Sequence, residues 1–548
     1  MATSTVSLLK IPSSEPRKPS AGTRAGSERW KALTLVSLLT AFSFLVQGYH
    51  PYAEDGGLYL AGIKRVLSPA MYPHESGFVL GHLRFSLFAP VVAWLVRFSG
   101  FGLETVLLLL YLGTIWATLW SAWLLAERCF LGRARFGSVT LLATWLTLPI
   151  AGTSLMLMDP YVTARSISTP CVLFATYYSL QFLMGLREDG RCELAALVKA
   201  AIALAVAVLM HPLMAAYGFG SILALASGSL SRRRMWLAAT GVLCAGAIAV
   251  ALVLQLTEQP EPPEYHQVAM SRYYWFLGQW HWYEWIGIAA PLLILGFAAL
   301  ARQSSNDNPA RTALARMCIT AGTSAVLISM LFARPTSSCL MVARLQPLRT
   351  FQIIYIVMIL FVGAQLSLWL GRKKFHWAAA FGLLAATMFL AERQTFPSSP
   401  HIELPSGQRK NAWVQAFDWI RNNTSKDALF ALDSDYITKP GEDAQSFRAI
   451  SERSSLPDYS KDGGEAAITP SLSAAWKNGQ ALQSGLSQRT DQDRIARLAP
   501  AGVDWIVLIK EATTSLPCAY SNGVVKVCRL PASTGREGVS GVVLQAKR

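Results

Sequence analysis

Long uncharged apolar segments recur through the first 391 residues of this 548-residue chain, and they constrain its fold more than any other feature. An α-helix needs about 20 apolar residues to cross the roughly 30 Å hydrocarbon core of a bilayer. Segments of roughly that length lie at 32–48, 105–126, 136–158, 166–186, 194–210, 212–230, 235–256, 285–301, 317–333, 351–370 and 375–391. The sequence therefore predicts a mainly α, polytopic membrane helix bundle with about 11 transmembrane helices.

The composition agrees with large regions that avoid water. Hydrophobic residues make up 52% of the chain and charged residues only 15%, whereas soluble domains carry roughly 25% charged residues. The net charge of +16 does not indicate a nucleic-acid partner, because many basic residues lie in short loops between apolar segments. We therefore expect membrane lipids, and no nucleic acid, as partners.

The basic residues also predict how the chain crosses the membrane. If 32–48 is the first span, the basic loops at 128–135, 187–191, 232–234, 302–316 and 372–374 share one side with the basic N-terminus. Cytoplasmic loops are enriched in Lys and Arg, so this side is expected to be cytoplasmic. An odd number of spans then places the chain after residue 395 on the outer face of the membrane.

Three parts follow from these patterns. Residues 1–30 are Ser- and Pro-rich and are expected to form a disordered cytoplasmic tail. Residues 31–394 form the membrane domain, and residues 395–548 form a soluble α/β domain. In the latter, helical spacing at 411–424 and strand-like segments at 428–435, 503–509 and 524–530 indicate the α/β class.

One further apolar segment does not fit the span pattern. Counting 84–100 as a span would place the later arginine clusters outside, so we interpret it as an interfacial or re-entrant helix. The segment 56–70 is interpreted as a second interfacial helix, so that the outer loop 49–104 carries two helices lying on the membrane. Near the C-terminus, Cys518 and Cys528 flank a candidate hairpin and could equally be paired or be two free thiols.

Acidic residues next to the spans are the first candidates for chemistry. Glu54 and Asp55 directly follow the first span and precede two glycines, and Asp159 lies on the same predicted face. A carboxylate there could act as a general base or hold a divalent cation such as Mg²⁺ or Mn²⁺. The alternatives are a solvated pair for Glu54 and Asp55, and a helix N-cap for Asp159.

Four arginines break the positive-inside pattern. They lie on the predicted outer side at Arg165, Arg334, Arg344 and Arg349. Because guanidinium groups bind phosphate through paired hydrogen bonds, these arginines are candidate ligands of a lipid phosphate. Pairing with anionic lipid headgroups or with outer carboxylates explains them equally well.

Two histidines on the same side, His50 and His211, are candidate substrate-binding residues, although each alone is as expected for a polar residue at a membrane interface. The chain has no metal-binding spacing of Cys and His, no nucleophile elbow and no glycine-rich phosphate loop. The last absence argues against an ATP-driven pump.

Several short motifs resemble those of the C-type (GT-C) membrane glycosyltransferase superfamily, in its bacterial branch. They are "YAEDGG" (52–57) after the first span, the helices near 56–70 and 84–99, "MDPY" (158–161) and "AFDWIRNNTSKDALFALD" (416–433). The resemblance covers most of the chain as architecture.

The resemblance implies an enzyme that moves a sugar from a polyprenyl-phosphate carrier to a glycan, lipid or protein acceptor on the outer face. With a bacterial branch, it also implies the bacterial inner membrane, with the C-terminal domain in the periplasm. It implies Asp55 or Glu54 as the base that deprotonates the acceptor, Asp159 as an assisting or metal-binding residue, and Arg344 and Arg349 as ligands of the lipid phosphate. Some members of the superfamily use a divalent cation and others use none.

Two other classes of function remain open. A transporter or lipid flippase is expected to carry ionisable residues at mid-membrane depth and inverted repeats. A non-catalytic membrane protein would use its outer domain to bind a partner.

Overall fold

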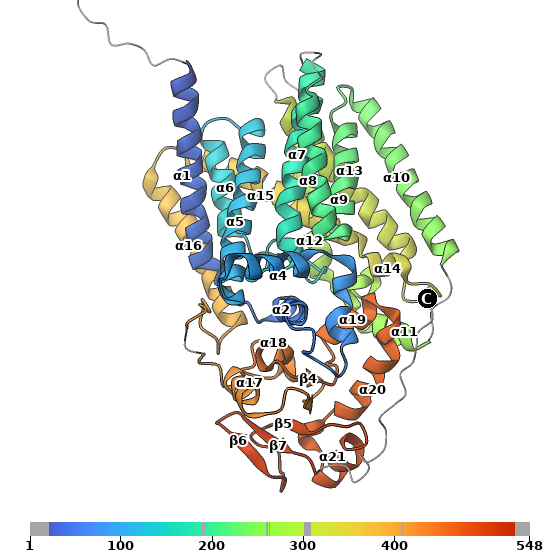
Figure 1. The fold of residues 1–548 in the computed structure, drawn as a ribbon. Coiled ribbons are helices and arrows are strands. Elements are labelled where there is room, and N and C mark those ends of the chain that lie inside the picture. The colour runs from blue at the N-terminus through green and yellow to red at the C-terminus, as the bar shows by residue number, and fades with distance from the viewer. Residues whose placement is uncertain are drawn as a thin grey trace, which may run out of the picture.

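The computed structural model describes residues 21–188, 190, 192–258, 261, 263–300, 308–407 and 409–531. Upright helices form one layer, and the chain after residue 395 forms a mixed α/β layer against their lower ends (Figure 1). The first helix, α1 (Ala21–Gln47), begins within the segment that was expected to be disordered, so the predicted tail boundary at residue 30 is wrong. Residues 1–20 of that tail lie outside the described residues.

Seven helices of the described chain are long and apolar enough to cross a membrane, or eight if one bent pair counts as a span. They are α1, α5 (Leu103–Cys129), α10 (Arg233–Thr257), α12 (Trp282–Leu300), α13 (Pro309–Phe332), the segment Met341–Leu370 that includes α14 (Met341–Leu345) and α15 (Phe351–Leu370), and α16 (Lys374–Thr395). Multiple apolar helices thus indicate a multi-pass membrane protein, but not the 11 predicted spans.

The other four predicted spans do not meet this length and composition, for local reasons. The segment 136–158 is not one helix: α6 (Arg133–Thr144) stops before Pro149, and the strands β1 (Pro149–Ile150) and β2 (Leu155–Met156) form a hairpin. Proline lacks the N–H that a helix needs. The helices α8 (Leu194–Met210) and α9 (Pro212–Gly228) have 17 residues each, about 25 Å. The helix α7 (Ala164–Glu188) is long enough, but its several Ser and Thr side chains make it more polar than the seven spans.

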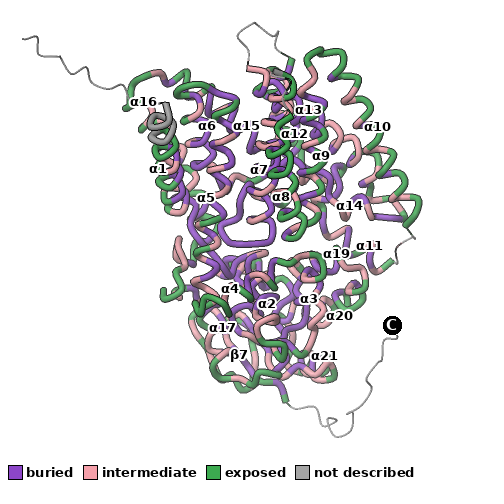
Figure 2. Tube along the Cα trace, turned by 45° about the horizontal axis from the view of Figure 1, so that its top comes forward, coloured by how far each residue is buried: buried purple, intermediate pink, exposed green. Residues whose placement is uncertain are grey.

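Exposed apolar side chains mark the surface that faces lipid. Figure 2 shows long exposed stretches on α10 and α16, and the exposed residues of α10 include Val250, Val253 and Leu256. The purple, buried residues lie between the helices. Such an apolar outer surface would be unfavourable in water over this area, whereas a bilayer accommodates it.

The segment 49–104, predicted to be an outer loop, contains α2 (Glu54–Leu67), α3 (Gly77–Leu80) and α4 (Phe88–Ser99). The helix α4 lies across the lower ends of the upright helices, with Trp94 and Phe98 exposed, as expected for an interfacial helix (Figure 1). The helix α2 has no exposed residue, because α4 packs on one side and the C-terminal layer on another. That 56–70 also lies on the membrane stays a prediction.

The C-terminal layer is built on a five-stranded sheet of order β4-β3-β5-β7-β6. Its strands are β3 (Leu429–Ala431), β4 (Ser454–Ser455), β5 (Trp505–Ile509), β6 (Cys518–Ser521) and β7 (Val525–Arg529), of which the first three pair in parallel and the last two antiparallel. The mixed α/β class of this region is confirmed.

Helices complete this layer. They are α17 (Ala412–Asn423), α18 (Phe447–Ser451), α19 (Lys461–Ile468), α20 (Ser473–Gln483) and α21 (Asp491–Leu498), with α11 (Pro263–Met270) packed against α19 and α20. Asn411 caps α17 by accepting hydrogen bonds from two backbone N–H groups. The buried rings of Phe417, Phe430 and Phe447 pack edge-on or tilted in the core beneath α2.

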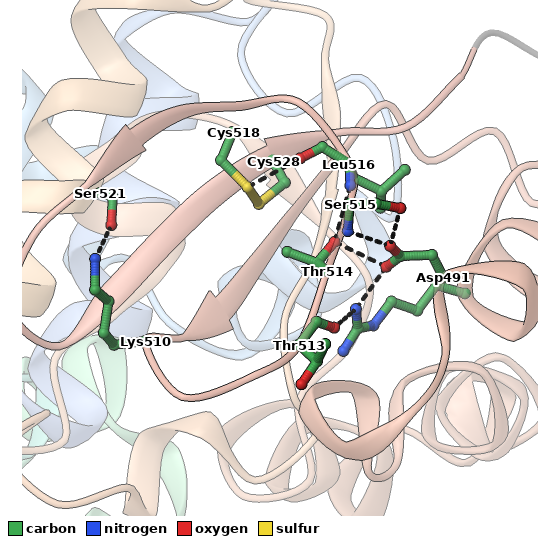
Figure 3. Close-up of a disulfide and its surroundings, with 10 residues drawn as sticks. Asp491, Lys510, Thr513, Thr514, Ser515, Leu516, Cys518, Ser521 and Cys528 are labelled. Carbon is green, nitrogen blue, oxygen red and sulfur yellow. Dashed lines mark hydrogen bonds and ion pairs between the residues drawn. A yellow bond between two sulfur atoms is a disulfide. The ribbon is translucent and has the colours of Figure 1, made fainter.

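The strand pair at the end of the described chain carries a disulfide. Cys518 and Cys528 are cross-strand partners of β6 and β7, and their sulfur atoms are bonded (Figure 3). Of the two alternatives that the sequence left open, the structure has the paired one.

Candidate functional site

The acidic pair Glu54–Asp55 begins α2, and the C-terminal layer fixes its backbone. Ala53 forms an isolated antiparallel bridge with Gln445, and the N–H of Glu54 donates to the carbonyl of Ala444 at 2.8 Å. The pair therefore lies where the first membrane helix, the outer loop and the C-terminal layer meet.

The two glycines after the pair allow close packing. A Cβ on Gly56 would lie 2.8 Å from Cγ of Tyr161, and a Cβ on Gly57 would lie 2.2 Å from Cβ of Ser446. Their small size therefore brings the segment of Asp159 and the C-terminal layer against the acidic pair, rather than leaving space for a ligand.

The second acidic candidate, Asp159, belongs to the same cluster. Its carboxylate accepts a hydrogen bond from Arg165 Nη2 at 2.7 Å, and the same Nη2 lies 3.7 Å from Asp55 Oδ2. Asp159 and Arg165 are both buried. Asp159 is five residues before α7, so the alternative that it caps this helix is wrong.

A lysine that the sequence did not single out completes the cluster. Lys461, at the start of α19, lies 3.1 Å from Asp55 Oδ1 and also forms an ion pair with Glu54 Oε2. No sequence motif marked this residue, since it is separated from Asp55 by 406 positions. Only the packing of the C-terminal layer against α2 brings it there.

Arg349 lies near the same carboxylates but differs from the other two cations. It belongs to the short 3₁₀ turn Pro347–Thr350 that precedes α15. Its positive charge acts to lower the pKa of Asp55 and the pKa of His211. Among the described residues it has neither an ion pair nor a side-chain hydrogen bond, and its Nε atom is buried without a partner.

The remaining candidates lie in other settings. Arg344 pairs with Glu261 at 2.7 Å, and Arg334 is exposed just after α13 and bonds the carbonyl of Met330 in that helix. The expectation that Arg334 and Arg344 join Arg349 at one phosphate is therefore not supported, because their charges are engaged or turned to the surface. The positions of Arg334 and Arg344 relative to the predicted spans could not show which of them is paired and which is exposed.

The two histidines are held by the protein itself. His50 is buried, pairs through Nδ1 with Glu403 at 2.8 Å and stacks on Phe396. His211 caps α9, since its Nδ1 accepts from the N–H of Met214. Burial, followed by the charges of Arg165 and Arg349, lowers the pKa of His211 to about 3, which keeps its ring neutral.

The carboxylates of the cluster have pKa values shifted in opposite directions. Burial acts to raise the pKa of Asp55, but Lys461 and then Arg165 overcome it and hold the pKa well below its usual range. Burial raises the pKa of Asp159 in spite of Arg165. Burial acts to lower the pKa of Lys461, but Asp55 and Glu54 raise it above its usual range. Asp55 and Lys461 are therefore charged at neutral pH.

The donor set does not fit the divalent cation that Asp55 and Asp159 were expected to hold. Both oxygens of Asp55, one of Asp159 and one of Glu54 face Lys461 or Arg165. Within the described chain, no group of three or more His, Cys, Asp or Glu side chains is placed to hold a metal ion. The positive charge beside these carboxylates comes from protein side chains.

No known family model matches the sequence, and no curated protein matches it. Among solved structures, the chain is similar to the archaeal oligosaccharyltransferase AglB of Archaeoglobus fulgidus in complex with an inhibitory peptide and a dolichol-phosphate. The identity is 12% and the TM-score 0.40, and the match covers 88% of this chain and 70% of that one.

Two further structures of the Archaeoglobus fulgidus oligosaccharyltransferase are also similar. The apo form has 11% identity, a TM-score of 0.44 and coverage of 87% of this chain and 69% of that one. The complex with Zn and sulfate has 12% identity, a TM-score of 0.38 and coverage of 87% and 68%. The similarity to this archaeal oligosaccharyltransferase thus extends over most of the chain.

Proposed function

We propose that the protein is a membrane glycosyltransferase that takes a sugar from a polyprenyl-phosphate carrier and passes it to an acceptor hydroxyl at the face where the C-terminal layer lies. The observation that carries the proposal is Arg349, a cation without a protein partner among the described residues, beside a cluster in which Lys461 and Arg165 are already paired. An uncompensated charge at such a site is costly, and an anionic group of a substrate would offset that cost. A phosphate is the anion that a guanidinium group recognises best.

Glu54 and Asp55 are the carboxylates that a substrate can reach. Their side chains are 41% and 34% exposed, whereas that of Asp159 is 6% exposed and bonded to Arg165. In the proposed reaction, the acceptor oxygen attacks the anomeric carbon of the sugar, and the bond from that carbon to the phosphate oxygen breaks. Glu54 and Asp55 orient the acceptor hydroxyl and one of the two receives its proton, while Arg349 stabilises the phosphate that leaves.

The disulfide supports the proposed orientation. Disulfides persist in oxidising compartments and are rare in the cytosol, so Cys518–Cys528 favours a periplasmic location for the C-terminal layer. The same orientation leaves the basic loops on the cytoplasmic side, as the positive-inside rule requires.

Binding of the carrier phosphate tests the central observation. Purified protein would be titrated with polyprenyl phosphate by native mass spectrometry, comparing wild type with Arg349→Gln and the matched control Arg334→Gln, which changes an exposed arginine. We expect Arg349→Gln to weaken binding by at least tenfold and Arg334→Gln to leave it unchanged. Equal binding by all three proteins would overturn the assignment.

Transfer itself is tested with a radiolabelled polyprenyl-phosphate hexose and a panel of glycan, lipid and peptide acceptors. We expect Asp55→Asn to reduce transfer by at least a hundredfold, because the acceptor loses its carboxylate. Undiminished transfer by Asp55→Asn and Glu54→Gln would remove the site assignment. Flux of the labelled lipid across vesicles without any transfer would instead indicate a flippase.

A further inference from the structure

Two protein cations occupy the space between the three carboxylates of the cluster. Lys461 Nζ faces Asp55 Oδ1 and Glu54, and Arg165 Nη2 faces Asp55 Oδ2 and Asp159. Asp55 is therefore bridged on both oxygens, one by each cation. The two cations together carry the charge of one divalent ion, and they bind the same oxygens that such an ion would need.

The lysine is presented by a rigid turn and not by a flexible loop. The N–H of Lys461 donates to Asp458 Oδ1 at 2.6 Å, and the N–H of Asp458 donates to Asp462 Oδ2 at 2.8 Å. Arg448 Nη1 binds the other oxygen of Asp462 at 2.6 Å. Arg272 holds the two carbonyls between them, those of residues 459 and 460, each at 2.7 Å.

This turn is also anchored in the interior. Asp458, Asp462, Arg448 and Arg272 are all buried. A side chain placed by so many buried hydrogen bonds loses little freedom when it forms its ion pairs, and it acts as a fixed counter-charge. Arg165 is fixed as well, because it is buried in the first turn of α7.

We propose that Lys461 and Arg165 take the place of a divalent cation in this carboxylate cluster, and that Lys461 keeps metal ions out of it. Lys461 is thereby a positioning residue, which holds the Glu54 and Asp55 side chains in place from the C-terminal layer. Its part in sugar transfer rests on the proposed function, whereas the exclusion of metal does not depend on it.

Manganese binding tests the exclusion directly. The full chain, purified and freed of metal, would be titrated with Mn²⁺ and the free ion followed by electron paramagnetic resonance. The proteins are wild type, Lys461→Met, Lys461→Arg, Lys461→Met with Asp55→Asn, and the control Lys410→Met, which changes an exposed lysine. We expect no site of micromolar affinity in wild type, Lys461→Arg or Lys410→Met. Lys461→Met is expected to gain one site, at least tenfold tighter than any in wild type, and Asp55→Asn to remove it.

Two results would overturn the inference. One is a tight Mn²⁺ site in wild type that Asp55→Asn abolishes. The other is a Lys461→Met protein that keeps its tryptophan fluorescence and melting transition but binds Mn²⁺ no better than wild type. If Lys461→Met does not fold, the wild-type and Lys461→Arg titrations still decide, because a tight site that Asp55→Asn removes from either of them contradicts exclusion, and its absence from both supports it.

Transfer in the presence of a chelator tests the functional part. We expect wild-type activity to be unchanged by EDTA, and Lys461→Met activity to be reduced at least tenfold and partly restored by Mn²⁺. Loss of wild-type activity in EDTA, regained with Mn²⁺, would overturn the inference. Absence of transfer in every condition would instead remove the proposed function and leave the Mn²⁺ titrations as the measure of metal exclusion.

Discussion

Arg165 and Asp159 form a buried ion pair, with Nη2 2.7 Å from Oδ2, at the point where the chain enters α7. Removing one partner from such a pair leaves the other charge buried and uncompensated, at a cost of about 3–5 kcal/mol. The pair therefore determines the stability of the site as well as its charge.

The change Arg165→Met is accordingly expected to lower the free energy of unfolding by about 3–5 kcal/mol. The control Arg497→Met breaks an exposed pair with Asp493 and is expected to cost less than about 1 kcal/mol. Melting of the purified proteins measures both, and a double variant that also changes Asp159→Leu is expected to cost less than the sum of the single changes. An Arg165→Met protein as stable as the control would contradict the prediction.

Gly57 is expected to tolerate no side chain. A Cβ there would lie 2.2 Å from Ser446 Cβ and 2.5 Å from the carbonyl oxygen of Tyr52, so Gly57→Ala requires α2 and the C-terminal layer to separate. We expect Gly57→Ala to lower the free energy of unfolding by about 1–3 kcal/mol and to speed proteolytic release of the C-terminal layer. The control is Gly464→Ala in α19, where nothing lies within 4 Å and helix propensity predicts a gain of up to about 1 kcal/mol. Similar protease resistance of the two variants would argue against the close packing.

The turn that presents Lys461 is expected to depend on pH through Asp458. Burial, and then the charge of Asp462, raises the pKa of Asp458 to about 7, whereas an unfolded aspartate titrates near about 3.9. Between these values the folded state binds the extra proton, so this group's contribution to stability falls as pH rises from about 4 to about 7.

The isosteric change Asp458→Asn removes that dependence. Relative to wild type, the free energy of unfolding of the variant is expected to rise by about 2–4 kcal/mol as the pH increases from 4 to 7.5, since each pKa unit corresponds to about 1.4 kcal/mol. Asp435→Asn, at an exposed ion pair with Lys439, serves as the control and is expected to show little pH dependence over this range. A difference between Asp458→Asn and wild type that stays constant with pH would refute the assignment.

The disulfide is expected to stabilise the C-terminal layer. Cys518 and Cys528 close a loop with a sequence separation of 10 residues, and the loss of unfolded-state entropy predicts about 2–3 kcal/mol. Maleimide labelling of the denatured chain should add two labels after reduction, out of eight cysteines in all. Cys518→Ser should abolish that difference and lower the melting temperature, whereas Cys192→Ser, at an exposed free thiol, should do neither. Eight labels without reductant would show that the bond is absent.

Much of the architecture could be predicted, because the formation of a long apolar helix depends mainly on the residues of that segment. Segments such as 105–126 and 235–256 become α5 and α10, since an apolar run of that length has few other stable forms. The segment 136–158 has the same composition, but Pro149 and the turn after it end α6 early. A count of apolar residues does not register such a local backbone break.

The candidate site likewise has one part that the local sequence predicts and another part that it does not. The sequence by itself identified Glu54, Asp55, Asp159 and Arg165, because carboxylates and arginines beside apolar segments are costly and therefore conspicuous. Only the tertiary structure decided which cations face them. It brought in Lys461 from 406 positions away, left Arg349 without a partner among the described residues and turned Arg334 to the surface. The sequence shows which charges lie beside apolar segments and are therefore costly to bury. The packing of the folded chain decides which opposite charge offsets each of them.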